Sequence, residues 1–163
     1  MIRTSGGKDA LSVVSVKGNG ETAIGGIGDP AQLYSLEWSH DDRFFSVSEG
    51  TSIQRSTHVI DAASGKEKTA FTNTGAVWAG DRNRIAYAAV DETVPQAVET
   101  EMTGSSGVIV CDIETLKKKT VLSPSSRYLY KPVRFDGSGK TISIERTDLT
   151  DRKQDTITIG DGS

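Results

Sequence analysis

The sequence predicts an all-β protein made of consecutive units, each with four short antiparallel strands. One ten-residue pattern occurs three times along the 163 residues, and a second pattern follows two of its copies at a similar distance. Repetition of this kind indicates a repeat architecture. No stretch shows sustained helical periodicity with a matching cap, so we expect almost no helix.

The ten-residue pattern reads as strand, turn, strand. Its copies span residues 38–47, 78–87 and 135–144. Each copy begins with an aromatic residue, carries polar turn formers in the middle and has hydrophobic residues at its eighth and tenth positions. Alternation after the turn is typical of a half-buried strand. In the third copy, Gly137 and Gly139 favour a tight hairpin, because glycine tolerates positive φ.

The second pattern is a strand, an Asp-containing turn, a basic stretch and another strand. Residues 59–71 and 110–122 match in this pattern without a gap, and a shorter relative spans residues 13–24. Joining the two patterns gives a four-stranded unit that repeats after 40 residues between Trp38 and Trp78. One blade of a β-propeller has about 40–45 residues, so the predicted fold is β-propeller-like.

We predict one structural domain over residues 1–163, because this length suits a single domain. Its predicted parts are a half blade at 10–26, a blade at 33–73, a blade at 75–124 with a long loop at 91–107, and an incomplete blade at 128–159. Closed propellers have about 4 to 8 blades. The chain is therefore either a small four-bladed variant or part of a longer propeller, and we favour the second interpretation.

Composition excludes several classes. The chain has a formal net charge of −3 and no basic field, so nucleic-acid binding is not expected. No apolar run reaches the length of a membrane span, and we expect no membrane insertion. Cys111 is the only cysteine, which excludes an intrachain disulfide and a Cys-rich zinc site. Its strand-like surroundings predict a buried, inert thiol.

The turn Trp38-Ser39-His40-Asp41-Asp42-Arg43 resembles the blade motif of TolB-like and WD-repeat-like propellers, with Asp42 where that family usually has glycine. The turns that begin at Trp78 and Phe135 keep parts of the same motif. Blades of this kind occur in periplasmic Tol components, in gating domains of prolyl-oligopeptidase-like enzymes and in extracytoplasmic sensor domains. The resemblance implies a scaffold with an interaction surface, and an extracytoplasmic or periplasmic location. The chain itself begins with no signal-peptide pattern.

The long loop is the candidate binding segment. It contains the acidic residues Asp91, Glu92, Glu99 and Glu101 and no basic residue. Long loops on a rigid β scaffold often carry function. We expect the loop to contact a basic protein partner or to contribute oxygen ligands to Ca²⁺, although no EF-hand pattern is present. An ordinary solvated insertion is the alternative.

Other motifs do not support catalysis or a cofactor. Residues 18–23 match the letters of a dinucleotide fingerprint, but the glycines and proline that follow exclude the helix that the mechanism needs. His40 and His58 are the only histidines. His40 lies beside Asp41, with which it can form a hydrogen-bonded pair, but no Gly-x-Ser-x-Gly elbow supplies a nucleophile. We therefore predict no catalytic residue, no cofactor and no metal site.

The repeated aromatic residues Trp38, Trp78 and Phe135 are interpreted as packing residues between blades, because they share one repeat position. The basic run 117–119 is interpreted as a solvated strand edge. Exposed blade edges would allow self-association.

The sequence thus predicts a noncatalytic protein-interaction or ligand-sensing module. The alternative is that the chain is the propeller gating domain of a larger prolyl-oligopeptidase-like hydrolase. A sugar- or ion-binding domain is a third hypothesis, which thermal-shift titration would test.

Overall fold

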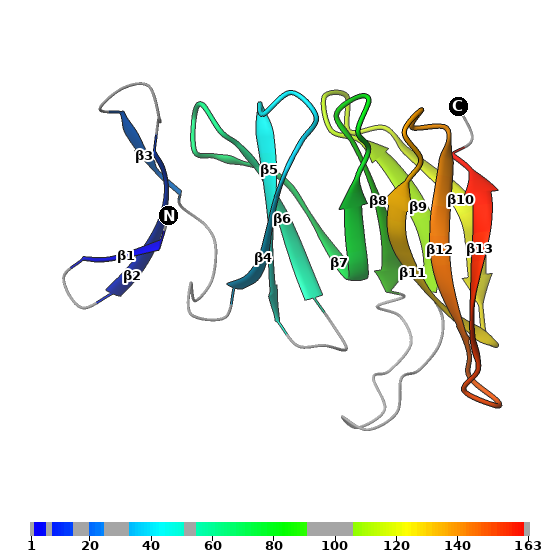
Figure 1. Ribbon diagram of the computed structural model, residues 1–163. Coiled ribbons are helices and arrows are strands. Elements are labelled where there is room, and N and C mark those ends of the chain that lie inside the picture. Colours follow the sequence, from blue (N-terminus) through cyan, green and yellow to red (C-terminus); the bar gives the residue numbers. More distant parts are fainter. Residues whose placement is uncertain are drawn as a thin grey trace.

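The computed structural model of the protein describes residues 2–5, 8–14, 20–24, 33–50, 55–90 and 106–161. These residues contain thirteen β-strands and no helix, and all strand pairs are antiparallel. The fold is therefore all-β, as the sequence predicts. Figure 1 shows the strands as successive groups along the molecule.

The described residues form three hydrogen-bonded sheets. The N-terminal sheet contains β1 (Ile2–Ser5), β2 (Lys8–Val14) and β3 (Glu21–Ala23). The central sheet contains β4 (Leu33–Trp38), β5 (Phe44–Gly50), β6 (Arg55–Asp61), β7 (Glu67–Trp78), β8 (Arg84–Val90), β9 (Ser106–Asp112) and β10 (Lys118–Ser125). The C-terminal sheet contains β11 (Tyr128–Phe135), β12 (Thr141–Asp148) and β13 (Gln154–Gly160).

The central sheet consists of two four-stranded halves that share β7. Residues 67–73 of β7 pair with β6, whereas residues 73–78 pair with β8 after a register shift between Asn73 and Ala76. We call β4–β6 with residues 67–73 the first half-sheet, and residues 73–78 with β8–β10 the second half-sheet. The sequence predicts a break between residues 73 and 75, but the chain passes from one half to the other without a turn.

The half-sheets and the C-terminal sheet pack face to face, with clusters of buried hydrophobic residues between them. Each strand can contribute to such a cluster because its alternate residues point to opposite faces. In β5, β8 and β12, the hydrophobic residues at the eighth and tenth positions of the repeated pattern all lie in the cluster toward the preceding sheet. These residues are Phe45 and Val47, Ile85 and Tyr87, and Ile142 and Ile144. All six are buried. Full burial of such a side chain contributes about 1.5–3 kcal/mol, so the repeated pattern specifies the stacking.

The aromatic first position of the pattern behaves differently in each copy. Phe135 is buried against the second half-sheet. Trp78 packs at the margin of the cluster between the half-sheets, and its Nε1 donates a hydrogen bond to Ser46 Oγ at 2.9 Å. Trp38, in contrast, is 43% exposed and leans on Phe45 with 5.1 Å between ring centroids. The prediction that Trp38 is a packing residue between blades is wrong, because the described part of the N-terminal sheet leaves the indole uncovered.

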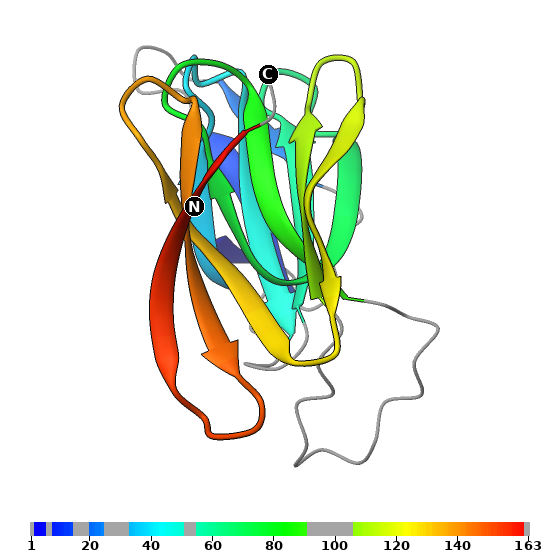
Figure 2. The same ribbon diagram turned by 90° about the vertical axis from the view of Figure 1, so that its right-hand side faces the viewer.

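One end of the sheets, at the top of Figures 1 and 2, carries the turns β4–β5, β6–β7, β7–β8, β9–β10 and β11–β12, and we call it the turn end. The same backbone hydrogen bond recurs there three times, from Ala62 N to Arg43 O, from Ile113 N to Asn83 O, and from Asp161 N to Lys140 O, at 2.8–2.9 Å. Aspartates close the turns: Asp61 Oδ1 accepts hydrogen bonds from Ser64 N and Oγ, and Asp112 Oδ1 accepts them from Thr115 N and Oγ1. Such Asx turns explain the Asp in the second sequence pattern.

Arg84 joins the second half-sheet to the C-terminal sheet at the turn end. Its guanidinium is buried, forms an ion pair with the buried Asp161, and donates a hydrogen bond from Nη2 to Gly139 O at 2.9 Å. Asp81 also contacts the guanidinium, at 3.4 Å. A buried arginine of this kind requires such partners, because an unpaired buried charge is costly.

The other local predictions have mixed outcomes. Cys111 is buried, and burial raises the pKa of its thiol, in agreement with the predicted inert cysteine. Residues 106 and 107 of the predicted long loop belong to β9, and β1 and the start of β2 precede the predicted half blade. No helix in the described ranges is long and apolar enough to cross a bilayer.

Candidate functional site

The acidic residues predicted to bind a partner lie outside the described residues. Asp91, Glu92, Glu99 and Glu101 belong to the connection between Val90, the last residue of β8, and Ser106, the first residue of β9. Within the repeat, this connection corresponds to residues 51–54, which join β5 to β6, and to residues 149–153, which join β12 to β13. All three follow the second strand of their unit, and that strand ends opposite the turn end.

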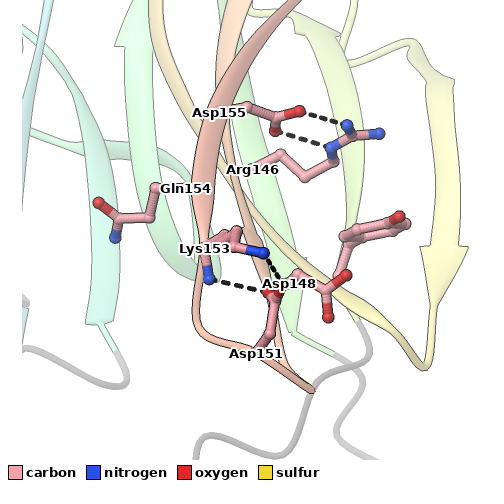
Figure 3. Close-up of a pocket in the computed structure, with 7 residues that line it drawn as sticks. Arg146, Asp148, Asp151, Lys153, Gln154 and Asp155 are labelled. Atoms are coloured by element: carbon pink, nitrogen blue, oxygen red, sulfur yellow. Dashed lines mark hydrogen bonds and ion pairs between the residues drawn. The ribbon is translucent and has the colours of Figure 1, made fainter.

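At this opposite end, the C-terminal sheet carries an open depression of about 230 Å³. Figure 3 shows charged side chains from β12, β13 and the hairpin between them grouped around it. We call it the Tyr128 depression, and its lining residues are Tyr128, Arg146, Asp148, Asp151, Lys153, Gln154 and Asp155.

Strand register explains why these residues meet. Along the face toward the second half-sheet, β12 presents Ile142, Ile144, Arg146 and Asp148 in turn. Cross-strand partners continue each row: Ile142 lies between Phe135 and Ile159, Ile144 between Pro132 and Ile157, and Arg146 between Tyr130 and Asp155. The apolar core rows therefore give way to a charged row at the open end of the space between the sheets. The depression lies at this change.

Tyr128 is the aromatic centre of the depression. The guanidinium carbon of Arg146 lies 4.5 Å from the centroid of its ring, and that of Arg127 lies 5.1 Å from it. These distances place both arginines in cation–π contact with one ring. Tyr130 follows along the same face, with 6.3 Å between the two tyrosine centroids.

Each cation at the depression has a carboxylate partner. Arg146 binds Asp155 through two nitrogens, with Nε donating to Oδ1 at 2.8 Å. Arg127 Nε donates to Asp148 Oδ2 at 2.8 Å, and Lys153 Nζ lies 2.8 Å from Asp151 Oδ2. Three cations and three anions thus leave no net charge. The hydrogen bond to Asp155 raises the pKa of Arg146, and the bond from Arg146 lowers the pKa of Asp155.

The hairpin that supports the depression is held by local hydrogen bonds. Asp148 Oδ1 accepts a bond from Thr150 N at 2.8 Å, which is the first cause of its lowered pKa. Its backbone oxygen accepts Arg152 N at 2.9 Å, where Arg152 has a φ of 61°. Leu149 N donates to Arg127 O at 2.8 Å. These bonds tie the β12–β13 hairpin to the start of β11.

The lining residues include no serine, cysteine or histidine, and each lining carboxylate is paired with a cation. The lining therefore contains no Ser–His or Cys–His pair. Among the described residues, no three His, Cys, Asp or Glu side chains lie close enough together to hold a metal ion. The depression can present an aromatic face, hydrogen-bond donors and acceptors, and charges of both signs.

The two histidines have different surroundings. His58 lies across three strands between Glu67, 2.6 Å from its Nδ1, and Glu49, 3.2 Å from its Nε2. Neither ring nitrogen is left to activate a hydroxyl group. The predicted His40–Asp41 pair is not formed: among the described residues, the Asp41 carboxylate accepts hydrogen bonds from Ser39, Arg43 and Asn83.

A signal for the depression is present in the sequence. In the alternating runs 142–146 and 155–159, Arg146 and Asp155 occupy positions where the period predicts apolar residues. Arg146 and Asp155 fall in the same row because β12 pairs with β13 in a register that places them opposite each other.

No protein-family model matches the chain, and no curated protein matches its sequence. Solved structures do match its fold. The tricorn protease is 15% identical with a TM-score of 0.60, and the match covers 94% of this chain and 15% of that one. The β-propeller domain of the trilobed protease from Pyrococcus furiosus is 14% identical with a TM-score of 0.59, and the match covers 99% of this chain and 50% of that one. TolB from Acinetobacter baumannii is 14% identical with a TM-score of 0.51, and the match covers 90% of this chain and 36% of that one.

These likenesses show the fold. The half-sheets and the C-terminal sheet correspond to β-propeller blades, and the chain has the architecture of a partial propeller, as the sequence predicts. The chain spans between 15% and 50% of the length of these three proteins.

Proposed function

We propose that the chain is a noncatalytic module that binds another protein through the Tyr128 depression. The observation that carries this proposal is the contact of the Tyr128 ring with both Arg127 and Arg146 at the open end of the space between two sheets. Tyrosine and arginine are enriched at protein interfaces, where a few of them supply most of the binding energy. The propeller fold supports a rigid surface of this kind.

A protein partner fits the depression better than a small ligand does. Small-molecule sites usually enclose roughly 300–1,000 Å³ with mostly apolar walls, whereas this depression has about 230 Å³ and three ion pairs around it. Balanced charges favour a mixed polar surface over a single anion or cation. Ion pairs at such a rim contribute specificity more than affinity.

A second candidate function is the one that the sequence resemblance suggests, a propeller domain that works with a hydrolase. The likeness to the tricorn and trilobed proteases supports it at the level of fold. The two candidates differ in the partner, because the second requires a peptidase domain next to the propeller.

The test is photo-cross-linking at the depression in cells that make the protein. A photoreactive residue replaces Lys153, whose side chain is 83% exposed, and in a control variant it replaces Lys140 at the turn end. We expect one protein to be captured at position 153 and not at position 140. A peptidase domain among the captured products would favour the second candidate.

Binding of the captured protein is then measured with purified components. Y128A and R146Q should weaken binding at least tenfold, which corresponds to about 1.4 kcal/mol. R82A, at the turn end, should leave the affinity unchanged, because Arg82 is exposed and distant from the depression. Equal binding by Y128A and wild type would overturn the proposal.

A further inference from the structure

Two turns of the same design, β6–β7 and β9–β10, differ at one position. Each begins with an aspartate, Asp61 or Asp112, that accepts hydrogen bonds from the turn and is joined by its backbone N to the lysine that closes the turn, at 2.9 Å. The residue before that lysine has a left-handed backbone in both turns, with φ of 67° at Gly65 and 58° at Leu116. The second turn therefore places leucine in a conformation that favours glycine.

Packing explains the glycine but not the leucine. A β-carbon on Gly65 would lie 2.5 Å from Ala23 O and 2.8 Å from Thr22 Cγ2, so β3 leaves no room for a side chain there. Leu116, in contrast, is 42% exposed and belongs to none of the three clusters of buried hydrophobic residues in the described ranges. An unfavourable backbone conformation that local packing does not offset points to a functional role for the side chain.

Leu116 is followed by lysines at the start of β10. Three of them are exposed, and none forms an ion pair with a carboxylate in the described part of the chain: Lys117, Lys118 and Lys119. The two acidic residues of the same turn have other partners. Asp112 accepts hydrogen bonds within the turn, and Glu114 accepts them from Arg43 and Asn83, each at 3.0 Å. The three ammonium groups are thus available to an outside anion.

The lysines spread over both faces of β10. Lys118 pairs with Cys111 and reaches toward the first half-sheet, where its Nζ lies 5.4 Å from the centroid of the Phe71 ring. Lys119 pairs with Val110, on the opposite face of the strand. A molecule that contacts the β9–β10 turn therefore meets positive charge on both sides of it.

An acidic polypeptide fits this surface better than an anionic membrane does. Carboxylates complement the unpaired ammonium groups, and an apolar side chain would cover Leu116. A flat anionic bilayer would also meet the neighbouring turns at the turn end, which carry Asp41, Asp42, Asp81 and Asp136. These carboxylates repel anionic lipids, whereas a polypeptide segment can contact one turn alone.

We propose that the β9–β10 turn docks an acidic polypeptide segment that carries an apolar residue. The apolar residue packs on Leu116, and the carboxylates on either side of it pair with Lys117 and Lys119. The turn lies at the turn end, whereas the Tyr128 depression lies at the opposite end. This second interaction surface goes beyond the proposed function and does not depend on it.

The first measurement identifies the preferred peptide chemistry. Short random peptides displayed on phage are selected against the purified chain, and one enriched acidic peptide is synthesised for nuclear magnetic resonance. We expect it to combine aspartate or glutamate with an aromatic or aliphatic residue, and to shift the amides of residues 114–119 but not those of residues 63–68. Absence of any acidic peptide that shifts residues 114–119 would overturn the proposal.

L116G is the most informative variant, because glycine suits the left-handed backbone and Gly65 occupies this position in the β6–β7 turn. It should leave the melting temperature unchanged or raise it, while weakening binding of the peptide by about fivefold or more. Loss of binding then cannot result from unfolding. Equal affinity of L116G and wild type for the peptide would overturn the role of the leucine.

The double variant K117Q/K119Q tests the charges. It should weaken the peptide about fivefold and reduce the dependence of binding on salt, since two exposed charge pairs are lost. K66Q/K68Q, in the β6–β7 turn, is the matched control and should change the affinity less than about twofold. Equal losses in the two double variants would mean that overall charge, and not this turn, attracts the peptide.

Two further comparisons separate the alternatives. Vesicles of phosphatidylglycerol and phosphatidylcholine should not bind the chain, and vesicle binding that L116G abolishes would overturn the choice of a polypeptide in favour of a membrane. Y128A should bind the peptide as wild type does, and L116G should bind the protein captured at position 153 as wild type does. Failure of either interaction therefore leaves the proposal for the other surface standing.

Discussion

The carboxylate of Asp81, in the turn between β7 and β8, lies against Gly139, in the turn between β11 and β12, and fills the space that a β-carbon on Gly139 would need. Gly139 also has a φ of +69°, a conformation that L side chains rarely adopt. The two turns therefore approach each other as closely as they do only because residue 139 is glycine. Arg84 lies in the same contact, bound to Asp81 and to Gly139 O.

We expect G139A to lower the free energy of unfolding by about 1–2 kcal/mol, mainly from strained backbone, because the Asp81 carboxylate is the end of a side chain that can shift. Urea denaturation measures the change. G137A is the matched control in the same turn, because a β-carbon there meets no atom within 4 Å, and it should change stability by less than about 0.5 kcal/mol. Equal stability of G139A and wild type would show that the close contact is absent.

Removal of the Ser46 hydroxyl should lower stability more than removal of the hydroxyl of its counterpart in the C-terminal sheet. S46A leaves the Trp78 Nε1–H without its acceptor at a partly buried site, which costs about 1 kcal/mol. Ser143 occupies the same repeat position, so S143A serves as the control and should cost less than about 0.5 kcal/mol. Thermal denaturation followed by tryptophan fluorescence compares the two. A larger loss in S143A would contradict the repeat equivalence.

R84M should be among the most destabilising substitutions at the turn end. It leaves the buried carboxylate of Asp161 without its guanidinium, and removal of one partner of a buried ion pair costs about 3–5 kcal/mol. Arg82 is 57% exposed, and R82M should change stability by less than about 0.5 kcal/mol. The double variant R84M/D161L should recover part of the loss, because neither charge then remains. No recovery would mean that the guanidinium acts through its other contacts.

Stability should fall in acid. Hydrogen bonds lower the pKa values of the turn aspartates, first from Ser64 N to Asp61, from Ser138 to Asp136 and from Thr150 N to Asp148. Because the unfolded chain takes up these protons first, the contribution is complete above the ordinary value of 3.8 and is lost as pH falls through the lower folded pKa values. Denaturation between pH 6 and pH 2 measures it.

D136N provides the matched test of the acid effect. It should be less stable than wild type at pH 6 and should lose less stability between pH 6 and pH 2. D42N is the control, because the Asp42 carboxylate accepts no hydrogen bond from the described residues. If D136N and D42N show the same pH dependence, the hydrogen-bonded turn does not contribute.

Local patterns in the sequence were sufficient to predict the strands and the direction in which their hydrophobic residues point. The eighth and tenth positions of the repeated pattern face the preceding sheet in all three copies, as alternation requires. Whether the residue at the first position is buried could not be predicted in this way. Trp38 and Phe135 are equivalent in sequence, but one is exposed and the other buried, because burial depends on the neighbouring sheet and not on the strand itself.

The Tyr128 depression shows the same limit. Arg146 and Asp155 interrupt the apolar alternation, which marks them as unusual from the sequence alone. Their meeting requires that β12 and β13 pair so that both residues fall in one row, and a shift of one residue would send one of them to the other face. Tyr128 joins them only through the pairing of β11 with β12. Register is a property of the whole sheet, so the site becomes visible only in three dimensions.

The continuous β7 limits how this architecture can be cut or lengthened. A gene duplication or an inserted domain at the junction of the two half-sheets would interrupt the continuous β7, one part of which pairs with β6 and the other with β8. Between β10 and β11, in contrast, the chain passes through Ser126 and Arg127 outside any strand. Insertions are tolerated best where the backbone takes no part in a ladder. An insertion between β10 and β11 would thus leave every strand whole, whereas one at the junction of the half-sheets would divide β7.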